Sequence, residues 1–198
     1  MDFETRPGSL QTEELISPAR ASSGSRVARR IVGIGLGALL VALAAQVIVP
    51  MVPVPITLQP LAVLVVGGLL GAAGGLSALL LYLFLGAVGL PVYAGGAAGA
   101  IHLVGPTGGY LLAFPIAAAV TGAIVSRNPR SVLRVLLACA LGMAIIHIGG
   151  VAQLAFLGGD PRLAFRVGFL PFLTGDLIKV GLAAALIVVA GSRIRSLL

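Results

Sequence analysis

Long apolar segments, broken only by proline, glycine and short charged stretches, dominate this 198-residue sequence and limit what it can fold into. Hydrophobic residues make up 59% of the chain and charged residues 10%, whereas a typical soluble domain carries about 25% charged residues. So little polar surface cannot coat a water-exposed fold, and the solvent must be lipid. Open sheet edges cannot be satisfied in hydrocarbon, and the alternation over about ten residues that marks a membrane barrel is absent, so we expect the segments to cross as helices.

The punctuation divides the chain into six predicted transmembrane helices, judged against the roughly 20 apolar residues that a span needs. They are residues 31–49, 58–70, 75–90, 109–125, 135–157 and 172–190. The second and third are short, so an alternative is one glycine-interrupted pair that tilts or dips into the membrane. We therefore expect an all-α membrane protein, with a disordered cytoplasmic leader over residues 1–30 and a six-helix transmembrane domain over residues 31–198.

Basic residues predict the orientation of these helices. Ten of the thirteen lysines and arginines fall on one side, in the leader, in residues 127–134 and near the carboxyl end. Since cytoplasmic loops carry the excess of positive charge, we expect both termini in the cytoplasm and a multi-pass protein of the plasma (inner) membrane. The net charge of +7 then reports orientation, and no nucleic-acid partner is expected, because no basic surface has interleaved aromatic residues. In an alternative interpretation, Arg29 and Arg30 begin a cleavable signal segment, but cleavage would leave five helices and spoil the charge asymmetry.

Two connections on the outer side have an unusual composition. Pro50, Pro53 and Pro55 restrict the backbone before the second helix and favour an extended chain. The glycine-rich connection 89–110 is long for a compact bundle. Non-helical backbone at membrane depth is tolerated where it lines a cavity, so we expect both connections to roof a pocket open to the outside. The alternative is that they are solvated connectors.

Asp176 and Lys179 in the last predicted helix are the most informative polar residues. Each charge would cost about 2.5–3.5 kcal/mol at the centre of a membrane helix, and their spacing puts both on one helical face. They must therefore point into the bundle, in the outer half, where an external ligand reaches them. A carboxylate that accepts N–H donors and an ammonium that pairs with an anion suit a small molecule with a urea-like group and a carboxylate. The alternative is an ion pair that only fastens the bundle.

No other pattern in the sequence predicts a reaction, a metal or a cofactor. Cys139 is the only cysteine, and with His102 and His147 it lacks the spacing of a metal site. No Gly-x-x-x-x-Gly-Lys-Ser/Thr motif is present, so the energy for any transport must come from elsewhere. An intramembrane hydrolase with Ser77 as nucleophile is an alternative, but Ser77 does not lie in a nucleophile motif. We expect a protein that is not an enzyme.

Four motifs together resemble the BioY family, the biotin-specific S components of energy-coupling factor transporters. They occur in the family's order from about residue 31 to the carboxyl end: Pro53-Val54-Pro55-Ile56-Thr57-Leu58-Gln59, Gly89-Leu90-Pro91-Val92-Tyr93-Ala94-Gly95-Gly96, Gly105-Pro106-Thr107-Gly108-Gly109-Tyr110-Leu111 and Gly175-Asp176-Leu177-Ile178-Lys179. The leader lies outside the resemblance. The first Met-Asp of the sequence opposes a nickel or cobalt version of the same fold, which would begin Met-His.

The resemblance implies an S-component fold of six helices and a role as the high-affinity subunit that captures biotin from outside. The pocket would lie under the first, third and fifth connections. Transport would be energised by separate partners: a transmembrane coupling subunit similar to EcfT and two cytoplasmic ATP-binding cassette ATPases. An ion-coupled secondary transporter of a small carboxylate-bearing vitamin, with Asp176 as proton carrier and no partners, is the alternative.

The resemblance also implies which residues meet the ligand and the partner. Asp176 and Lys179 fall where the family binds its ligand, and we assign them to the ureido group and the carboxylate of biotin, respectively. A stripe of small residues on the first helix falls where the family contacts the coupling subunit. The implied pocket also contains Gln59, Tyr82, Tyr93, Gly109 and Tyr110, and the implied coupling contact contains Ala38 and Ala42.

Overall fold

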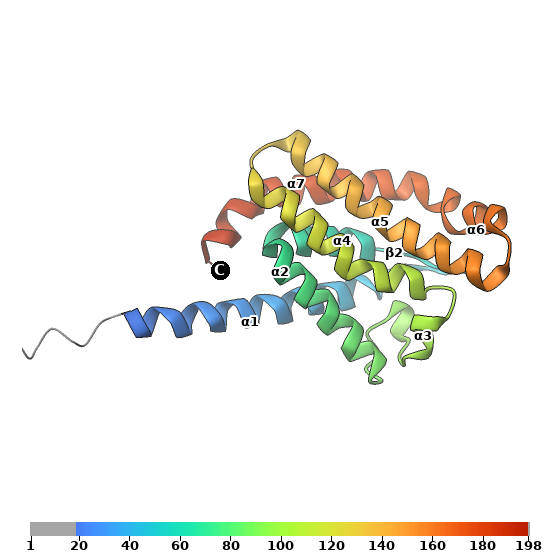
Figure 1. The fold of residues 1–198 in the computed structure, drawn as a ribbon, viewed down its shortest axis with the longest axis horizontal. Coiled ribbons are helices and arrows are strands. Elements are labelled where there is room, and N and C mark those ends of the chain that lie inside the picture. The colour runs from blue at the N-terminus through green and yellow to red at the C-terminus, as the bar shows by residue number, and fades with distance from the viewer. Residues whose placement is uncertain (1–18, 198) are drawn as a thin grey trace, which may run out of the picture.

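The computed structural model describes the backbone of residues 19–197 and the side chains of residues 24 and 26–191 as a bundle of helices (Figure 1). In chain order the elements are α1 (Ala19–Ala44), β1 (Ile48–Val49), β2 (Ile56–Thr57), α2 (Gln59–Ala87), the 3-10 helix η1 (Ala94–Gly96), α3 (Ile101–Val104), α4 (Gly108–Arg127), α5 (Val132–Gly158), α6 (Pro161–Gly168), the 3-10 helix η2 (Leu170–Phe172) and α7 (Leu173–Leu197). Helix α4 packs against α2 and α5, α7 packs against the same two helices, and α1 packs on α2.

Helix α2 is a hairpin of two helices that reverses at Gly71. The backbone there leaves the helical region, with φ 74° and ψ −178°. Gln59 and Tyr82 would lie about 34 Å apart along a straight helix, yet the side-chain amide of Gln59 donates to the Tyr82 hydroxyl at 2.6 Å. The two halves are the second and third helices of the prediction. Five helices of the described chain are long and apolar enough to cross a membrane when α2 is counted as one. The reversal divides α2 into two segments, which gives the six that were predicted.

Close approach of backbones holds this hairpin against α4. A Cβ atom on Gly122 of α4 would lie only 2.6 Å from the amide nitrogen of Ala72 and from the carbonyl oxygen of Gly67. Only glycine leaves room for such an approach, and small residues at helix contacts are the usual device for packing helices in lipid, where apolar burial offers little driving force. The turn of α2 is therefore fixed by α4.

The bundle has two distinct ends. Figure 1 shows the start of α1, the end of α7 and the connection between α4 and α5 at one end, and β2, α3 and α6 toward the other. Gly71 lies at the first end, since a Cβ on it would come 3.5 Å from the Ser126 hydroxyl. Both described ends of the chain thus share one side, as the distribution of basic residues predicts.

The amino-terminal boundary differs from the prediction. Residues 1–18 of the predicted leader lie outside the described residues, but the rest of that leader is helical, because α1 begins at Ala19. The alanines and arginines between 19 and 30 are good helix formers, which explains how the helix extends beyond its apolar part. At its other end α1 stops at Ala44 rather than residue 49, because Ile48 and Val49 pair with Thr57 and Ile56 in a short antiparallel sheet.

A further short helix, α6, was not among the predicted elements. The side chain of Asp160 accepts hydrogen bonds from the backbone N–H groups of Arg162 and Leu163, at 2.9 and 3.1 Å, and Pro161 occupies the first turn. Aspartate at the cap followed by proline is a frequent helix start, so the signal was present in the sequence. Helix α6 leads directly into η2 and α7.

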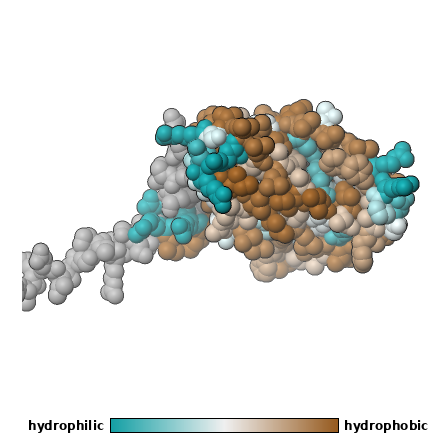
Figure 2. Space-filling view, turned by 45° about the horizontal axis from the view of Figure 1, so that its top comes forward, coloured by the Kyte–Doolittle hydropathy of each residue, from teal (hydrophilic) through white to brown (hydrophobic). Residues whose placement is uncertain are grey.

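The outer surface of the bundle suits a lipid environment. Figure 2 shows hydrophobic residues over most of the visible middle of the molecule, with hydrophilic residues gathered mainly toward its two ends. Large apolar side chains are exposed on α1, α5 and α7, among them Leu36, Leu141 and Leu177. The apolar surface between two polar ends is what a chain that spans a bilayer requires.

We predict that Gly122→Ala destabilises the bundle, because the added Cβ meets backbone atoms of α2 that cannot move away. The expected penalty is that of an overpacked core, about 1–3 kcal/mol, seen as a lower midpoint of thermal unfolding in detergent. Gly181→Ala in α7 is the matched control, since nothing lies within 4 Å of a Cβ there. Equal unfolding midpoints for the two variants would contradict the described contact between α2 and α4.

Candidate ligand-binding site

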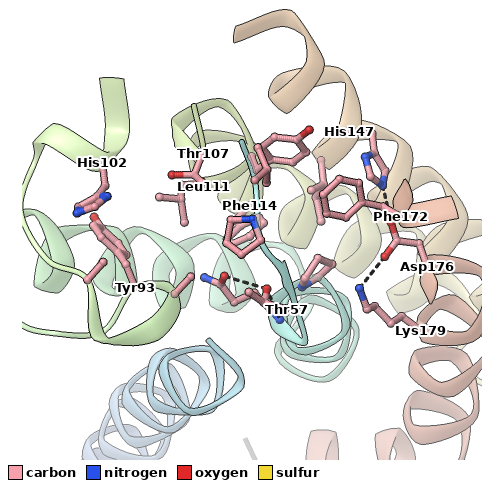
Figure 3. A pocket seen from close by; sticks show the side chains of 18 residues that line it. Thr57, Tyr93, His102, Thr107, Leu111, Phe114, His147, Phe172, Asp176 and Lys179 are labelled. Carbon is pink, nitrogen blue, oxygen red and sulfur yellow. Dashed lines mark hydrogen bonds and ion pairs between the residues drawn. The ribbon is translucent and has the colours of Figure 1, made fainter. Parts of the chain in front are cut away.

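A cavity of about 240 Å³ lies among the outer ends of the helices. It is somewhat smaller than the roughly 300–1,000 Å³ of typical drug-sized ligand pockets, so it suits a small molecule. Its wall comes from β2 and the start of α2, from η1, α3, α4, α5, η2 and α7, and from the connections before β2 and α3. The two outer connections predicted to roof a pocket contribute Pro55 and Tyr93 to its wall, respectively. Figure 3 shows Asp176, Lys179 and His147 at one side and Tyr93 and His102 at the other.

Asp176 and Lys179 lie at the start of α7, where the chain enters the bundle from η2. Their side chains are 6% and 7% exposed, respectively, and the Lys179 ammonium donates to Oδ1 of Asp176 at 2.8 Å. The spacing of three residues makes this contact possible within one helix. The first turn of α7 also favours a carboxylate, because the unpaired N–H groups at a helix start carry partial positive charge.

A third polar group completes this side of the cavity. Nε2 of His147, from the middle of α5, lies 2.6 Å from Oδ2 of Asp176. One carboxylate oxygen of Asp176 therefore contacts Lys179 of its own helix, and the other contacts His147 of α5. Removing one partner of a buried pair leaves an uncompensated charge, at a typical cost of about 3–5 kcal/mol. The contact with His147 ties α7 to α5, and all three side chains line the cavity.

A chain of neutral polar side chains lies along the wall formed by β2 and α2. The Thr57 hydroxyl donates to the side-chain oxygen of Gln59 at 3.0 Å, and the Gln59 amide donates to the Tyr82 hydroxyl at 2.6 Å. Thr57 and Gln59 line the cavity, whereas Tyr82 lies behind Gln59 and holds it. The reversal of α2 at Gly71 is what brings Gln59 and Tyr82 together.

Two tyrosines of the predicted site line the cavity from opposite sides. The hydroxyl of Tyr93 donates to the Leu83 carbonyl at 2.7 Å, and its ring meets His102 edge-on. Burial raises the pKa of Tyr93, so this phenol stays neutral. The hydroxyl of Tyr110 donates to the Gly168 carbonyl at 2.6 Å and so ties α4 to the end of α6. Both rings are positioned by backbone carbonyls.

Gly109, which the resemblance implied as a pocket residue, lies at a helix contact instead. A Cβ on it would come 2.7 Å from the Cβ of Gln153 on α5, and it is absent from the wall of the cavity. Gln153 in turn donates to the carbonyls of Leu103 and Gly105 at 3.2 and 2.6 Å, which fixes the connection after α3. Gly109 thus shapes the site by letting α4 and α5 approach.

The small residues of α1 pack toward the rest of the bundle. Ala38 is 2% exposed within the core, and a Cβ on neighbouring Gly37 would lie 3.1 Å from Ala78 of α2. Ala42 is half-buried against the same core. The stripe therefore serves the packing of α1 on α2, and contact of another subunit with Ala38 would require these helices to separate.

Sequence reasoning missed several residues that line the cavity. His147 and His102 were considered only as metal ligands, Thr107 only as part of a motif, and Phe114 and Phe172 were not singled out. His147 had a usable signal, because an ionisable residue inside a membrane helix is a functional candidate by default. The aromatic residues had none, since an apolar lining residue resembles any core residue in sequence.

The structure places the residues of the metal and hydrolase alternatives apart from one another. Among the described residues, no group of three or more His, Cys, Asp or Glu side chains could hold a metal ion. Ser77 lines a second cavity beside Arg30 and Gly71, at the end of the bundle away from both histidines. A serine there has no base from either histidine.

Comparisons with known proteins agree with one another. The BioY family model matches residues 13–196. The biotin transporter BioY of Thermotoga maritima is 40% identical over 156 residues, which cover 79% of this chain and 92% of that protein. The probable biotin transporter BioY of Pyrococcus horikoshii is 40% identical over 153 residues, covering 76% and 90%.

A solved structure has the same fold. It is the crystal structure of the S-component for biotin from an ECF-type ABC transporter, and it matches with a TM-score of 0.75 over 91% of this chain and 95% of that chain. The sequence identity is 24%, so this likeness bears on the fold alone. It agrees with the six-helix fold expected from the sequence.

Proposed function

This chain belongs to the BioY family, and from that membership we propose that it is the S component of an energy-coupling factor transporter, which captures biotin with high affinity from the outer side of the membrane. It is a multi-pass membrane protein with an S-component fold. The observation that carries the proposal is the cavity at the outer end, with a buried acid and a buried base in its wall. Charged groups are kept inside a membrane protein chiefly where they serve a ligand or an ion.

The distance between the two charges indicates which part of biotin they meet. The ureido group and the carboxylate lie at opposite ends of the biotin molecule, whereas the Lys179 ammonium and the Asp176 carboxylate are 2.8 Å apart. A ureido group presents an N–H donor beside a carbonyl acceptor, so one ureido edge matches both side chains. Asp176 accepts its N–H, and Lys179 donates to its carbonyl oxygen. This replaces the assignment of Lys179 to the biotin carboxylate.

The carboxylate of biotin then lies toward the opposite side of the cavity. His102, Tyr93 and Thr107 lie there, and the hydrocarbon chain between the two ends of the ligand would cross the apolar wall formed by Leu111 and Phe114 (Figure 3). His102 and Thr107 are only partly buried, so a charged group at this side keeps part of its hydration. The buried end of the cavity receives the neutral ureido ring.

Capture of the ligand requires no chemical step, so the protein acts as a binding subunit and not as an enzyme. We propose that the energy for uptake comes from partners, a transmembrane coupling subunit and two ATP-binding cassette ATPases. In support, the solved structure with the same fold is an S-component from an ECF-type ABC transporter. The sequence supplies no ATP-binding motif of its own.

We predict that the purified protein binds biotin and that Asp176→Asn weakens binding by about tenfold or more, equal to about 1.4 kcal/mol. The reason is that an amide gives up the charge that accepts the ureido N–H and pairs with Lys179. Calorimetric titration measures the dissociation constant. Arg162→Ala, an exposed outer charge that does not line the cavity, is the control and should bind like wild type. If titration of the intact protein with biotin shows no binding, the proposed function is wrong.

We predict that Lys179→Met weakens the binding of biotin and of biotin amide by the same factor. In biotin amide the carboxylate is replaced by a neutral group, while the ureido ring is unchanged. If Lys179 donates to the ureido carbonyl, its loss affects both ligands equally, whereas a contact with the carboxylate would make biotin alone sensitive. The four dissociation constants from titration decide between the two orientations of the ligand.

We predict ATP-dependent uptake of labelled biotin by proteoliposomes that contain this chain, the coupling subunit and both ATPases. Uptake should require ATP on the side of the membrane where the ATPases lie. Collapse of the proton gradient should leave the rate unchanged, because Asp176 is held by two donors and does not act as a proton carrier. Uptake by this chain without partners that stops when the gradient is collapsed would instead establish the ion-coupled alternative.

A further inference from the structure

His147 contacts the acid of the site from a different helix. It lies on α5, 29 residues from Asp176 in the sequence, and its side chain is 8% exposed at the wall of the cavity. Its Nε2 atom is 2.6 Å from Oδ2 of Asp176, while Lys179 occupies the other oxygen. Figure 3 shows the three side chains in a row, with Asp176 in the middle.

Aromatic side chains fix the orientation of the His147 ring. The ring meets Phe169 edge-on with 5.0 Å between centroids, and Tyr110 edge-on with 6.1 Å. Phe172 lies at 5.9 Å in a tilted arrangement. The hydrogen bond from Tyr110 to the Gly168 carbonyl keeps this wall in place. The imidazole is therefore held with Nε2 toward Asp176.

The unpartnered ring nitrogen indicates where the proton lies. Nδ1 of His147 is buried and has no hydrogen-bond partner among the described residues. Were the proton on Nδ1 alone, the bare Nε2 would face the carboxylate oxygen at 2.6 Å, with two acceptors and no hydrogen between them. A proton on Nε2 has the Asp176 carboxylate as its acceptor. The contact is therefore an Nε2–H donating to Oδ2, with Nδ1 as the bare nitrogen.

We propose that His147 is a positioning residue for the ligand, and this inference rests on the proposed function. Its Nε2–H holds the Asp176 carboxylate in the orientation that accepts the ureido N–H of biotin. When the ligand carbonyl competes for the Lys179 ammonium, His147 remains hydrogen-bonded to the Asp176 carboxylate. Binding therefore does not leave the buried charge of Asp176 without a partner. A carboxylate has about four acceptor positions, so a donor on each oxygen leaves capacity for the ligand.

Substitution of His147 by glutamine and by asparagine tests the proposal, because the two side-chain amides place their N–H donor at different distances from the backbone. The Nε2 atom of glutamine reaches about as far as Nε2 of histidine, whereas the shorter asparagine places its nitrogen near the position of Nδ1. Purified full-length His147→Gln should bind biotin within about threefold of wild type, and His147→Asn and His147→Leu should each lose about tenfold or more, as expected for a hydrogen bond to a charged group. Calorimetric titration gives the affinities.

A double-mutant cycle separates positioning from a merely structural role. In the background of Asp176→Ala, which removes the acceptor, His147→Leu should change the affinity by less than about threefold. If His147→Leu lowers the affinity for biotin by the same factor in the Asp176→Ala background as in the wild type, the proposal is overturned. Wild-type affinity in His147→Leu, or equal affinities in the Gln and Asn variants, would also overturn it.

Two further measurements keep the outcomes distinct. The midpoint of thermal unfolding is compared for every variant, and if His147→Leu does not fold, the Gln and Asn variants decide the proposal. Biotin binding by the wild-type protein is measured first. No binding by wild type overturns the proposed function and this inference with it, whereas strong binding by wild type and by His147→Leu overturns the inference alone.

Discussion

A charge buried in a lipid-embedded bundle must find its partners inside the protein, and the site of this chain follows from that constraint. Asp176 takes one donor from its own helix and one from α5. The second contact ties α5 to the start of α7, the point where the chain re-enters the bundle from η2. The same contacts that satisfy the charge set the shape and the polarity of the cavity, so stability and ligand recognition share one group of atoms.

The reversal of α2 supplies the opposite wall. Without the left-handed backbone at Gly71, Gln59 and Tyr82 would lie at the two ends of a long helix. The reversal brings them within one hydrogen bond, and Gly122 allows α4 to cover the turn. Gly71 lies at one end of the bundle, but it determines the position of Gln59 and Tyr82 at the other end, because the two halves of α2 are rigid and run side by side. The composition shows many glycines, but only the packing tells which of them permit contact.

Much of the architecture follows from residue patterns. The six apolar segments and the common side of both ends were predictable, because a backbone in lipid must satisfy its own hydrogen bonds as helix and because charged residues are costly there. The extension of α1 back to Ala19 and the short α6 were not predicted, since neither lies in an apolar segment. The inward face of Ala38 was also undecided, because a stripe of small residues suits an internal helix contact and an external one equally.

The sequence by itself determined that the protein lives in a membrane, which side its ends share, and that Asp176 and Lys179 must face inward. Each of these depends on the free energy of moving a single residue type into lipid, which is a local property. Only the tertiary structure decided that His147 meets Asp176, that Gly109 packs at the contact of α4 with α5, and that the Asp176 and Lys179 side chains contact each other. The first two depend on distances between helices far apart in the chain, and no local pattern carries them.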